Sequence, residues 1–247
     1  MRARAAMNQP PRFFVAAKCA PGAAVTLEPA DARHARLVLR MRSDDPIVVV
    51  CDGSAWDARL IEMSSDQTLA RIEASRNEQG GELPAFVTVM QALTKGAKFD
   101  EIVEKTVELG ARRIVPLRCE RSYGEADQRK LERWRRVARA AAMQSRRRFL
   151  PTVEAPRDWS ETVQLAREQL VLVAHEDALP GSLATALAKN GGPFAIAVGP
   201  EGGLAPAEVE AARAARCALV SLGPTILRTE TAAAALLAAC AALRGWW

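Results

Sequence analysis

The chain has 247 residues, 49% of them hydrophobic, and a formal net charge of +5 at pH 7. This length fits one or two domains with substantial cores, and so mild a basic excess permits a polyanionic partner without requiring one. Five widely spaced cysteines without a Cys-x-x-Cys pair, and two distant histidines, argue against a disulfide framework and against a zinc site. We therefore expect reduced thiols, no bound metal and a cytoplasmic location.

Short β-type runs separated by turn signals dominate the first part of the chain. They cover residues 47–51, 56–62 and 68–73, and their spacing predicts a small barrel or sandwich. A short helix is expected between residues 31 and 40, with an apolar side formed by Ala32, Ala35, Val38 and Leu39.

The pattern changes near residues 77–82, after which strands and helices alternate. Apolar runs predict strands at residues 85–90, 113–117, 169–174, 194–198 and 217–222. Helices are expected at residues 99–109, 126–146 and 182–188, and from Pro206 and Thr229 onward. This alternation predicts a parallel sheet covered by helices on both faces.

Two segments of the chain are strongly basic. Residues 129–148 hold nine Lys and Arg residues against one acid, Glu132, and predict an amphipathic helix with a basic outer face. An N-terminal cluster, Arg33, His34, Arg36, Arg40 and Arg42, follows the pair Phe13-Phe14, which we interpret as core. Such arginines are either a solvated surface or contacts to RNA phosphates, which would supply affinity but no sequence specificity.

Two glycine-proline turns follow predicted strands near the C-terminus. One is Gly199-Pro200-Glu201-Gly202-Gly203, and the other begins at Gly223-Pro224 and runs through Arg228 and Glu230 to Ala232. Glycines let backbone N–H groups approach a ligand closely, and parallel sheets build ligand pockets at the carboxyl ends of their strands. The glycines alone would equally fit ordinary turns. A Gly-x-Gly-x-x-Gly after a strand and a Gly-Lys-Ser/Thr loop are both missing from the sequence, which weakens the common nucleotide-binding interpretations.

Taken together, the sequences of these two turns resemble those of the ribosomal small subunit methyltransferase E family. Its members are SPOUT-class enzymes that methylate N3 of a uridine in 16S ribosomal RNA. Similar motifs lie at Arg12-Phe13-Phe14 and at residues 33–41, at Lys95-Gly96-Ala97-Lys98 and at residues 105–110. Two departures are visible. The family's Glu-Gln-Ser-Gly-Arg is here Met143-Gln144-Ser145-Arg146-Arg147, and its Ser or Thr cap after the first turn is Ala205.

The resemblance implies a PUA-like β-barrel that binds RNA over residues 1–78 and a SPOUT-type knotted parallel sheet with a trefoil knot over residues 79–247. It implies S-adenosyl-L-methionine as cofactor and 16S ribosomal RNA, within the small ribosomal subunit, as partner. The residues expected to bind the cofactor are His175, Gly199, Gly203, Leu222, Gly223 and Leu227. Those expected to bind RNA are Arg12, Arg33, His34, Arg40, Arg42 and Arg147.

The chemistry assigns roles to two charged residues beside the second turn. Methyl transfer needs donor and acceptor held in line and needs no metal. Uracil N3 carries a proton that must leave, and the negative charge on the ring oxygens must then be stabilised. Arg228, permanently cationic, suits the second task, and Glu230 would accept the proton if burial raised its pKa. The alternative for this pair is an ion pair that anchors the start of a helix. The target base is expected to be splayed out of the RNA structure.

The closing helix, residues 229–243, is apolar on every side, and a helix of this kind must be covered all round. We therefore expect a two-fold homodimer that buries it, as the resemblance also implies. Its apolar stretch, residues 232–243, is too short to cross a bilayer. Two other functions stay open: a SPOUT enzyme that methylates a ribose 2′-hydroxyl of transfer or ribosomal RNA, and an RNA-binding protein without catalysis.

Overall fold

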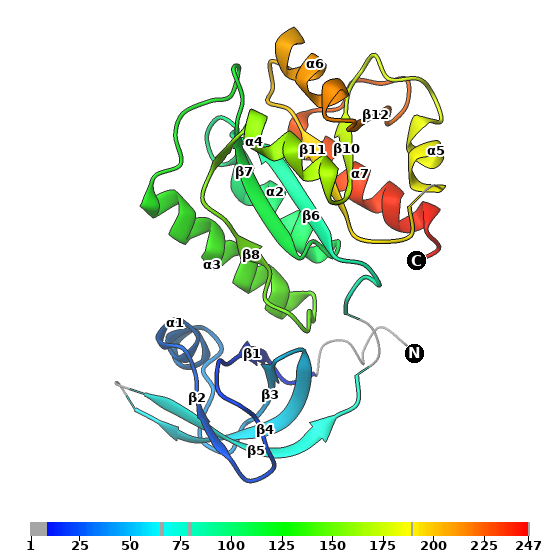
Figure 1. The fold of residues 1–247 in the computed structure, drawn as a ribbon. Coiled ribbons are helices and arrows are strands. Elements are labelled where there is room, and N and C mark those ends of the chain that lie inside the picture. Colours follow the sequence, from blue (N-terminus) through cyan, green and yellow to red (C-terminus); the bar gives the residue numbers. More distant parts are fainter. Residues whose placement is uncertain (1–8, 65–66, 79–80, 189, 247) are drawn as a thin grey trace. The chain divides into compact units, whose positions relative to one another are not determined.

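The structure is a computed structural model that describes residues 9–64, 67–78, 81–188 and 190–246 (Figure 1). The chain divides into two compact units. The first contains residues 1–82 and 142–150, and the second contains residues 83–141 and 151–247. The predicted boundary between residues 78 and 79 touches a residue outside the described ones, and it stays a prediction. The short segment 142–150 belongs to the first unit although it lies far along the chain.

The first unit is a curled five-stranded sheet. Its strands lie in the order β1-β3-β4-β5-β2, with β1 parallel to β3 and the other pairs antiparallel. The strands are β1 (Arg12–Phe14), β2 (Ala24–Thr26), β3 (Pro46–Cys51), β4 (Ser54–Met63) and β5 (Thr68–Arg76). Alternate apolar side chains on β3, β4 and β5 point into one core. Phe13 and Phe14 are buried, which confirms their interpretation as core residues.

The expected short helix forms, but with an unusual second turn. It consists of α1 (Pro29–Arg33) followed by η2 (His34–Val38), a turn of π-helix. In this turn the Leu39 backbone N–H donates to the His34 carbonyl oxygen at 3.0 Å, five residues back. Val38 and Leu39, predicted to lie on the apolar side of this helix with Ala32 and Ala35, are exposed. Ala35 is buried, whereas Val38 is 65% exposed.

The second unit contains a seven-stranded sheet in which every strand pair is parallel, as predicted. The strand order is β12-β10-β11-β6-β7-β8, with β9 also paired to β7. The strands are β6 (Val87–Ala92), β7 (Arg113–Arg118), β8 (Thr152–Val153), β9 (Arg157–Asp158), β10 (Leu170–Ala174), β11 (Phe194–Val198) and β12 (Ala218–Val220). All residues of β6 and β11 are buried, and β11 accordingly is a continuous apolar run, whereas β6 also contains Thr88 and Gln91.

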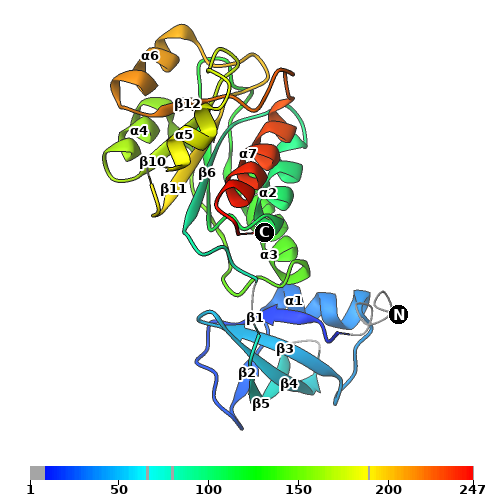
Figure 2. The same cartoon turned by 90° about the vertical axis from the view of Figure 1, so that its right-hand side faces the viewer.

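Helices cover both faces of this sheet (Figure 2). They are α2 (Lys98–Glu108), α3 (Gln128–Gln144), α4 (Trp159–Val163), η3 (Gln164–Arg167), α5 (Ser182–Ala188), α6 (Pro206–Ala214) and α7 (Thr229–Leu243). On one face Trp159 of α4 and Val209 of α6 pack in the core beneath the central strands. On the other, Ile102 of α2 packs with Ala232 and Ala233 of α7. The trefoil knot stays a prediction of the resemblance.

At the N-terminus of α6, a glutamate carboxylate provides a cap in place of the expected hydroxyl group. Ala205 offers no side-chain acceptor, but the Glu208 carboxylate accepts the Ala205 backbone N–H at 2.8 Å. The same carboxylate accepts the Glu120 backbone N–H at 2.8 Å, and it thereby ties α6 to the loop after β7. Among the described helices, none is long and apolar enough to cross a membrane.

Candidate active site

A cavity of about 690 Å³ lies at the carboxyl ends of three neighbouring strands. The loops that follow β10, β11 and β12 line it, together with Lys98 at the start of α2 and Thr229 and Ala232 in the first turns of α7. Because β12, β10 and β11 are adjacent and parallel, their carboxyl ends meet at one edge of the sheet. The six residues expected to bind a cofactor all line this cavity: His175, Gly199, Gly203, Leu222, Gly223 and Leu227. Their roles stay a prediction.

The turn after β11 is fixed by contacts at both of its ends. Gly203 has φ +71°, a conformation that favours glycine, and its N–H donates to the Pro200 carbonyl at 2.9 Å. At Gly199 a side chain would begin only 3.1 Å from the Leu204 side chain, so the position is tight. The Arg121 guanidinium donates to the Gly202 carbonyl at 3.0 Å. The backbone of this turn is therefore held rigidly beside the cavity.

The turn after β12 supplies apolar walls. Leu222 and Leu227 are partly buried and pack against the cluster that contains Val198 and Ala232. The Ser221 backbone N–H donates to the Ser182 hydroxyl of α5 at 3.0 Å, which anchors the start of the turn. Ile226, at the tip, is 90% exposed. An apolar wall beside exposed backbone groups is suited to the flat ring of a nucleoside.

His175 directly follows β10. Its backbone N–H donates to the Val220 carbonyl at 3.1 Å, and its ring Nδ1 accepts the Asp177 backbone N–H at 3.2 Å. The imidazole thus shapes its own turn and also borders the cavity. Among the described residues there is no cluster of three or more His, Cys, Asp or Glu that could hold a metal ion.

The charged residues at the start of α7 have partners that the sequence did not reveal. Arg228 is exposed and lines the cavity. Glu230 is paired with Lys98, with 3.6 Å between Oε2 and Nζ, and it does not line the cavity. The Lys98 ammonium also lies 3.2 Å from Oε1 of Glu201. The ion pair expected as an alternative therefore forms, but its cation is Lys98 instead of Arg228.

The pKa values of this network follow from its hydrogen bonds. Burial raises the pKa of the Glu201 carboxyl, but hydrogen bonds from the backbone and from Lys98 outweigh it, so this pKa lies below its usual value. The hydrogen bond to Glu201, together with the charge of Glu230, raises the pKa of Lys98. Lys98 and Glu201 are therefore firmly ionised at neutral pH.

Two consecutive buried hydrogen bonds join β6 of the sheet to the start of α7 and to the turn after β11. Gln91 of β6 donates from Nε2 to the Thr229 hydroxyl at 2.9 Å, and this hydroxyl donates to the Gly199 carbonyl at 2.7 Å. The sequence analysis did not single out Gln91, placed Thr229 only at the start of the closing helix, and gave Lys98 no role. One signal was available: Gln91 is a buried amide within a predominantly apolar strand, and buried polar groups require partners.

The residues expected to bind RNA fall into two groups. Arg33, His34, Arg40 and Arg42 are exposed. Arg12 and Arg147 are buried within the first unit instead, and the expectation that they bind RNA stays a prediction. Arg12 pairs with Glu78 and donates to the Arg147 carbonyl at 3.1 Å. Arg147 has a side chain 2% exposed and binds Glu82 through two nitrogens, at 3.0 and 2.7 Å.

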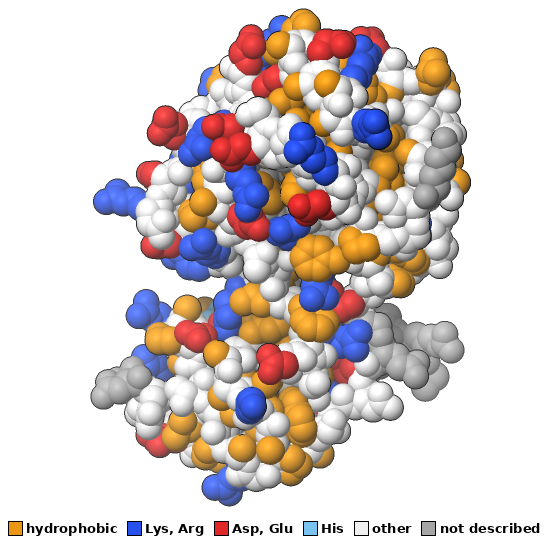
Figure 3. Space-filling model, in the orientation of Figure 1, with side chains coloured by type: hydrophobic (Ala, Val, Ile, Leu, Met, Phe, Trp, Pro, Cys, Tyr) orange, Lys and Arg blue, Asp and Glu red, His pale blue; other side chains and the backbone are white. Residues whose placement is uncertain are grey.

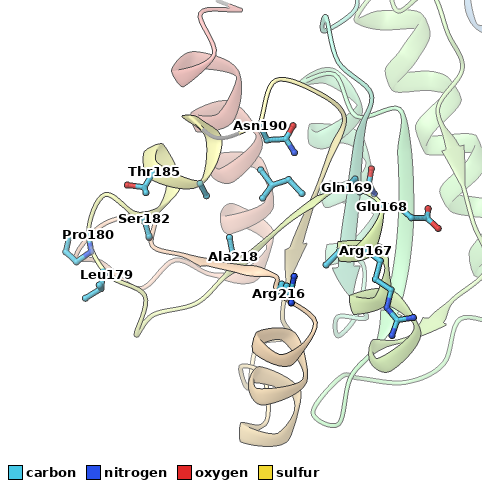
Figure 4. Close-up of a pocket in the computed structure, with 13 residues that line it drawn as sticks. Arg167, Glu168, Gln169, Leu179, Pro180, Ser182, Thr185, Asn190, Arg216 and Ala218 are labelled. Carbon is cyan, nitrogen blue, oxygen red and sulfur yellow. The ribbon is translucent and has the colours of Figure 1, made fainter.

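The remaining surface carries both signs of charge. On the face shown in Figure 3, basic side chains are interspersed with acidic ones and do not form one continuous patch. A second hollow, of about 730 Å³, lies at the opposite end of the sheet, at the amino ends of β10 and β12 (Figure 4). Residues from the η3–β10 junction, from the α5 region and from the start of β12 line it, and none of the expected site residues does.

Comparison with known proteins is consistent with this site. The family model described as an RNA methyltransferase domain matches residues 81–241, and that described as an RNA methyltransferase PUA domain matches residues 27–73. A Synechocystis ribosomal RNA small subunit methyltransferase E is 36% identical over 94% of this chain and 77% of its own length. The Bacillus subtilis protein of the same name is 33% identical over 86% of this chain and 87% of its own length.

Solved structures extend the similarity to the whole fold. The ribosomal RNA small subunit methyltransferase E of Neisseria gonorrhoeae, solved with bound S-adenosyl methionine, is 31% identical. It matches with a TM-score of 0.85 over 95% of this chain and 98% of its own. A parallel sheet of this order, a cavity at its carboxyl edge and the two matching domain models define an RNA methyltransferase with a PUA domain. The chain belongs to the ribosomal RNA small subunit methyltransferase E family.

Proposed function

We propose that this protein transfers a methyl group from S-adenosylmethionine to N3 of a specific uridine in 16S ribosomal RNA. The observation that carries the proposal is the cavity at the carboxyl edge, which collects all six expected cofactor residues with Arg228 at its rim. The N. gonorrhoeae relative, solved with S-adenosyl methionine, supports the same assignment. The residues fit this group: glycine turns offer backbone hydrogen-bonding atoms, and Leu222 and Leu227 offer apolar walls.

In the reaction, the methyl group leaves a positively charged sulfur, which becomes a neutral thioether, and forms a bond to N3 of the base. The N3 proton must leave the ring before or during this step. The protein's task is to align the reactants and to stabilise the negative charge on the carbonyl oxygens of the base. We assign charge stabilisation to Arg228, which is exposed at the cavity and stays cationic.

Glu230 remains the candidate proton acceptor. Its Oε2 atom is buried, makes no hydrogen bond and lies 3.6 Å from the Lys98 ammonium with which it pairs. Its position in the first turn of α7 is also favourable for a carboxylate, because helix N-termini carry a partial positive charge.

The exposed basic residues of the first unit, Arg33, His34, Arg40 and Arg42, are proposed to contact RNA phosphates. The protein is further proposed to act in the cytoplasm on RNA of the small ribosomal subunit. It is also proposed to form a two-fold dimer across α7. One side of that helix is buried in the chain, whereas Ala235 and Ala239 on another side are half-buried and Leu243 is exposed.

Two experiments test the proposed function. Calorimetric titration with S-adenosylmethionine must show binding, and a failure to bind would leave an RNA-binding protein without catalysis. Nucleoside mapping of 16S ribosomal RNA from cells that lack the protein must show the loss of one N3-methyluridine. Loss of a 2′-O-methylated nucleoside instead would reassign the acceptor to a ribose hydroxyl.

A further inference from the structure

Lys98 is held at the wall of the cavity by two carboxylates from distant parts of the chain. It begins α2, Glu201 lies in the turn after β11, and Glu230 lies in the first turn of α7. The Lys98 ammonium is 3.2 Å from Oε1 of Glu201 and 3.6 Å from Oε2 of Glu230. The same Oε1 also accepts the Lys95 backbone N–H at 3.3 Å. Lys98 and Glu201 both line the cavity, whereas Glu230 does not.

This arrangement contributes little to the stability of the fold. The Lys98 side chain is 35% exposed and that of Glu201 is 23% exposed, and ion pairs near the surface add little to folding free energy. Its effect is instead to immobilise a long side chain that would otherwise sample many rotamers. A cation fixed in advance beside a reactant stabilises negative charge without the cost of reorganisation during the reaction.

The Lys98 ammonium lies among charged residues from several elements. The two carboxylates approach Lys98 from the turn after β11 and from α7. On α2, the nearby Lys105 is paired with Glu101, and its own charge also interacts with Glu230. Arg228 lines the same cavity from the start of α7. An anionic group in this cavity would therefore be approached by two cations from different elements, although Glu176 and Glu201 line the cavity as well.

We propose that Lys98 contacts an anionic oxygen of a reactant in this cavity, and that Glu201 and Glu230 are positioning residues that hold its ammonium in place. The inference rests on the proposed function. Two reactant groups carry an oxygen of this kind. One is the carboxylate of the cofactor's methionine part, and the other is a carbonyl oxygen of uracil once N3 has lost its proton. Both are oxygens with negative charge, and they can be separated by experiment.

The test compares Lys98→Met, which removes the charge with little change of shape, with Lys98→Arg, which keeps it. Lys105→Met is the matched control, because it removes a lysine from the same helix that does not line the cavity. Affinities for S-adenosylmethionine and for 5′-methylthioadenosine, which lacks the carboxylate, are measured by calorimetry. Turnover is measured on small-subunit RNA with both reactants saturating, and circular dichroism checks that each variant is folded.

If Lys98 binds the carboxylate, Lys98→Met weakens S-adenosylmethionine binding at least about tenfold and leaves methylthioadenosine binding unchanged. If it acts on the uracil oxygen, both affinities stay unchanged and kcat falls at least about tenfold. In either case Lys98→Arg retains part of the lost function. The inference is overturned if Lys98→Met behaves like Lys105→Met, or if the affinities for both ligands fall together. Failure of the wild type to bind S-adenosylmethionine would instead defeat the proposed function itself.

The positioning role has a separate readout. Glu201→Gln should produce a weaker effect on the same quantity that Lys98→Met changes, either cofactor affinity or kcat. Combining the two substitutions should be no worse than Lys98→Met alone, because Glu201 acts through Lys98. Additive losses in the double variant would show that Glu201 acts independently and would overturn this part of the inference.

Discussion

The Thr229 hydroxyl donates a 2.7 Å hydrogen bond to the Gly199 carbonyl oxygen and thereby joins the first residue of α7 to the turn after β11. The two residues are 30 positions apart, and both line the cavity. The hydroxyl itself is held by Gln91 of the central strand β6. One buried side chain therefore fixes the relative position of the glycine turn and of the helix that carries Arg228 and Glu230.

Replacing Thr229 by Val should separate these two elements while preserving shape. The Gly199 carbonyl and the Gln91 amide would both lose a partner in a buried place, which should lower the free energy of unfolding by about 2 kcal/mol. Affinity for S-adenosylmethionine should fall with it. Thr229→Ser, which keeps the hydroxyl, should stay close to the wild type in both respects. Urea unfolding and calorimetry measure the two quantities, and equal behaviour of Val and Ser at this position would contradict the linkage.

Arg228 should affect the chemical step more than cofactor binding. Its side chain is exposed at the cavity, so Arg228→Met should leave stability nearly unchanged. Loss of a cation that stabilises developing charge should lower kcat by about 10²-fold or more. Single-turnover methylation with saturating cofactor measures this effect. A kcat equal to that of the wild type would remove Arg228 from the reaction.

Several helices and strands were predicted from the sequence with their correct limits. The helix from Ser182 to Ala188, the strand from Phe194 to Val198 and the helix from Thr229 to Leu243 have the predicted limits. Their apolar runs and flanking glycines leave few other local structures. The three-residue strands β1 and β2 were not predicted, because segments so short have no measurable periodicity and depend on their neighbours in the sheet.

Residues of the site were predictable where they directly follow a predicted strand, as His175 does, or lie in a glycine turn. Lys98 and Glu201 are 103 positions apart, and Gln91 and Thr229 are 138 positions apart. A local pattern contains no information on pairs at such separations. The same limit explains why the burial of Arg147, in a run of three arginines, was not predicted. Its ion-pair partner Glu82 lies 65 positions earlier in the chain, and both side chains are buried.

The buried and exposed arginines should therefore respond differently to neutralisation. Arg147→Met would leave the Glu82 carboxylate buried without a compensating cation, with only backbone N–H donors from Arg148 and Phe149, and this should cost about 3 kcal/mol of stability. Neutralising Arg33, Arg40 and Arg42 together should leave stability almost unchanged. It should weaken RNA binding and reduce its log–log salt slope by about one for each phosphate that is no longer neutralised. Cofactor affinity should not change in the triple variant, and an unaltered salt slope would show that these residues form a solvated surface only.

Acid should weaken the first unit through Glu78. Burial raises the pKa of this carboxyl, but hydrogen bonds and charges from Arg12 and Arg76 outweigh it and hold the pKa below its usual value. Because the folded pKa is lower than the unfolded one, the stabilisation is fully present above the unfolded pKa and disappears as the pH falls through the folded pKa. Glu78→Gln should thus destabilise the protein at pH 7 and differ less from the wild type near pH 3, as measured by urea unfolding. A difference that is independent of pH would contradict the assigned ion pairs.

The last prediction concerns the open side of α7. The helix buries Ala233, Leu236, Leu237 and Cys240 within its own chain. Its small residues elsewhere would let a second backbone approach closely, and the proposed dimer would cover them. Ala235→Glu would place a charge in that contact, where burial without a partner is strongly unfavourable. The variant should therefore be monomeric and inactive yet folded, whereas the control Ala235→Ser should remain dimeric. Light scattering measures the mass of the protein in solution. An active wild type with the mass of one chain would contradict the proposed dimer across α7.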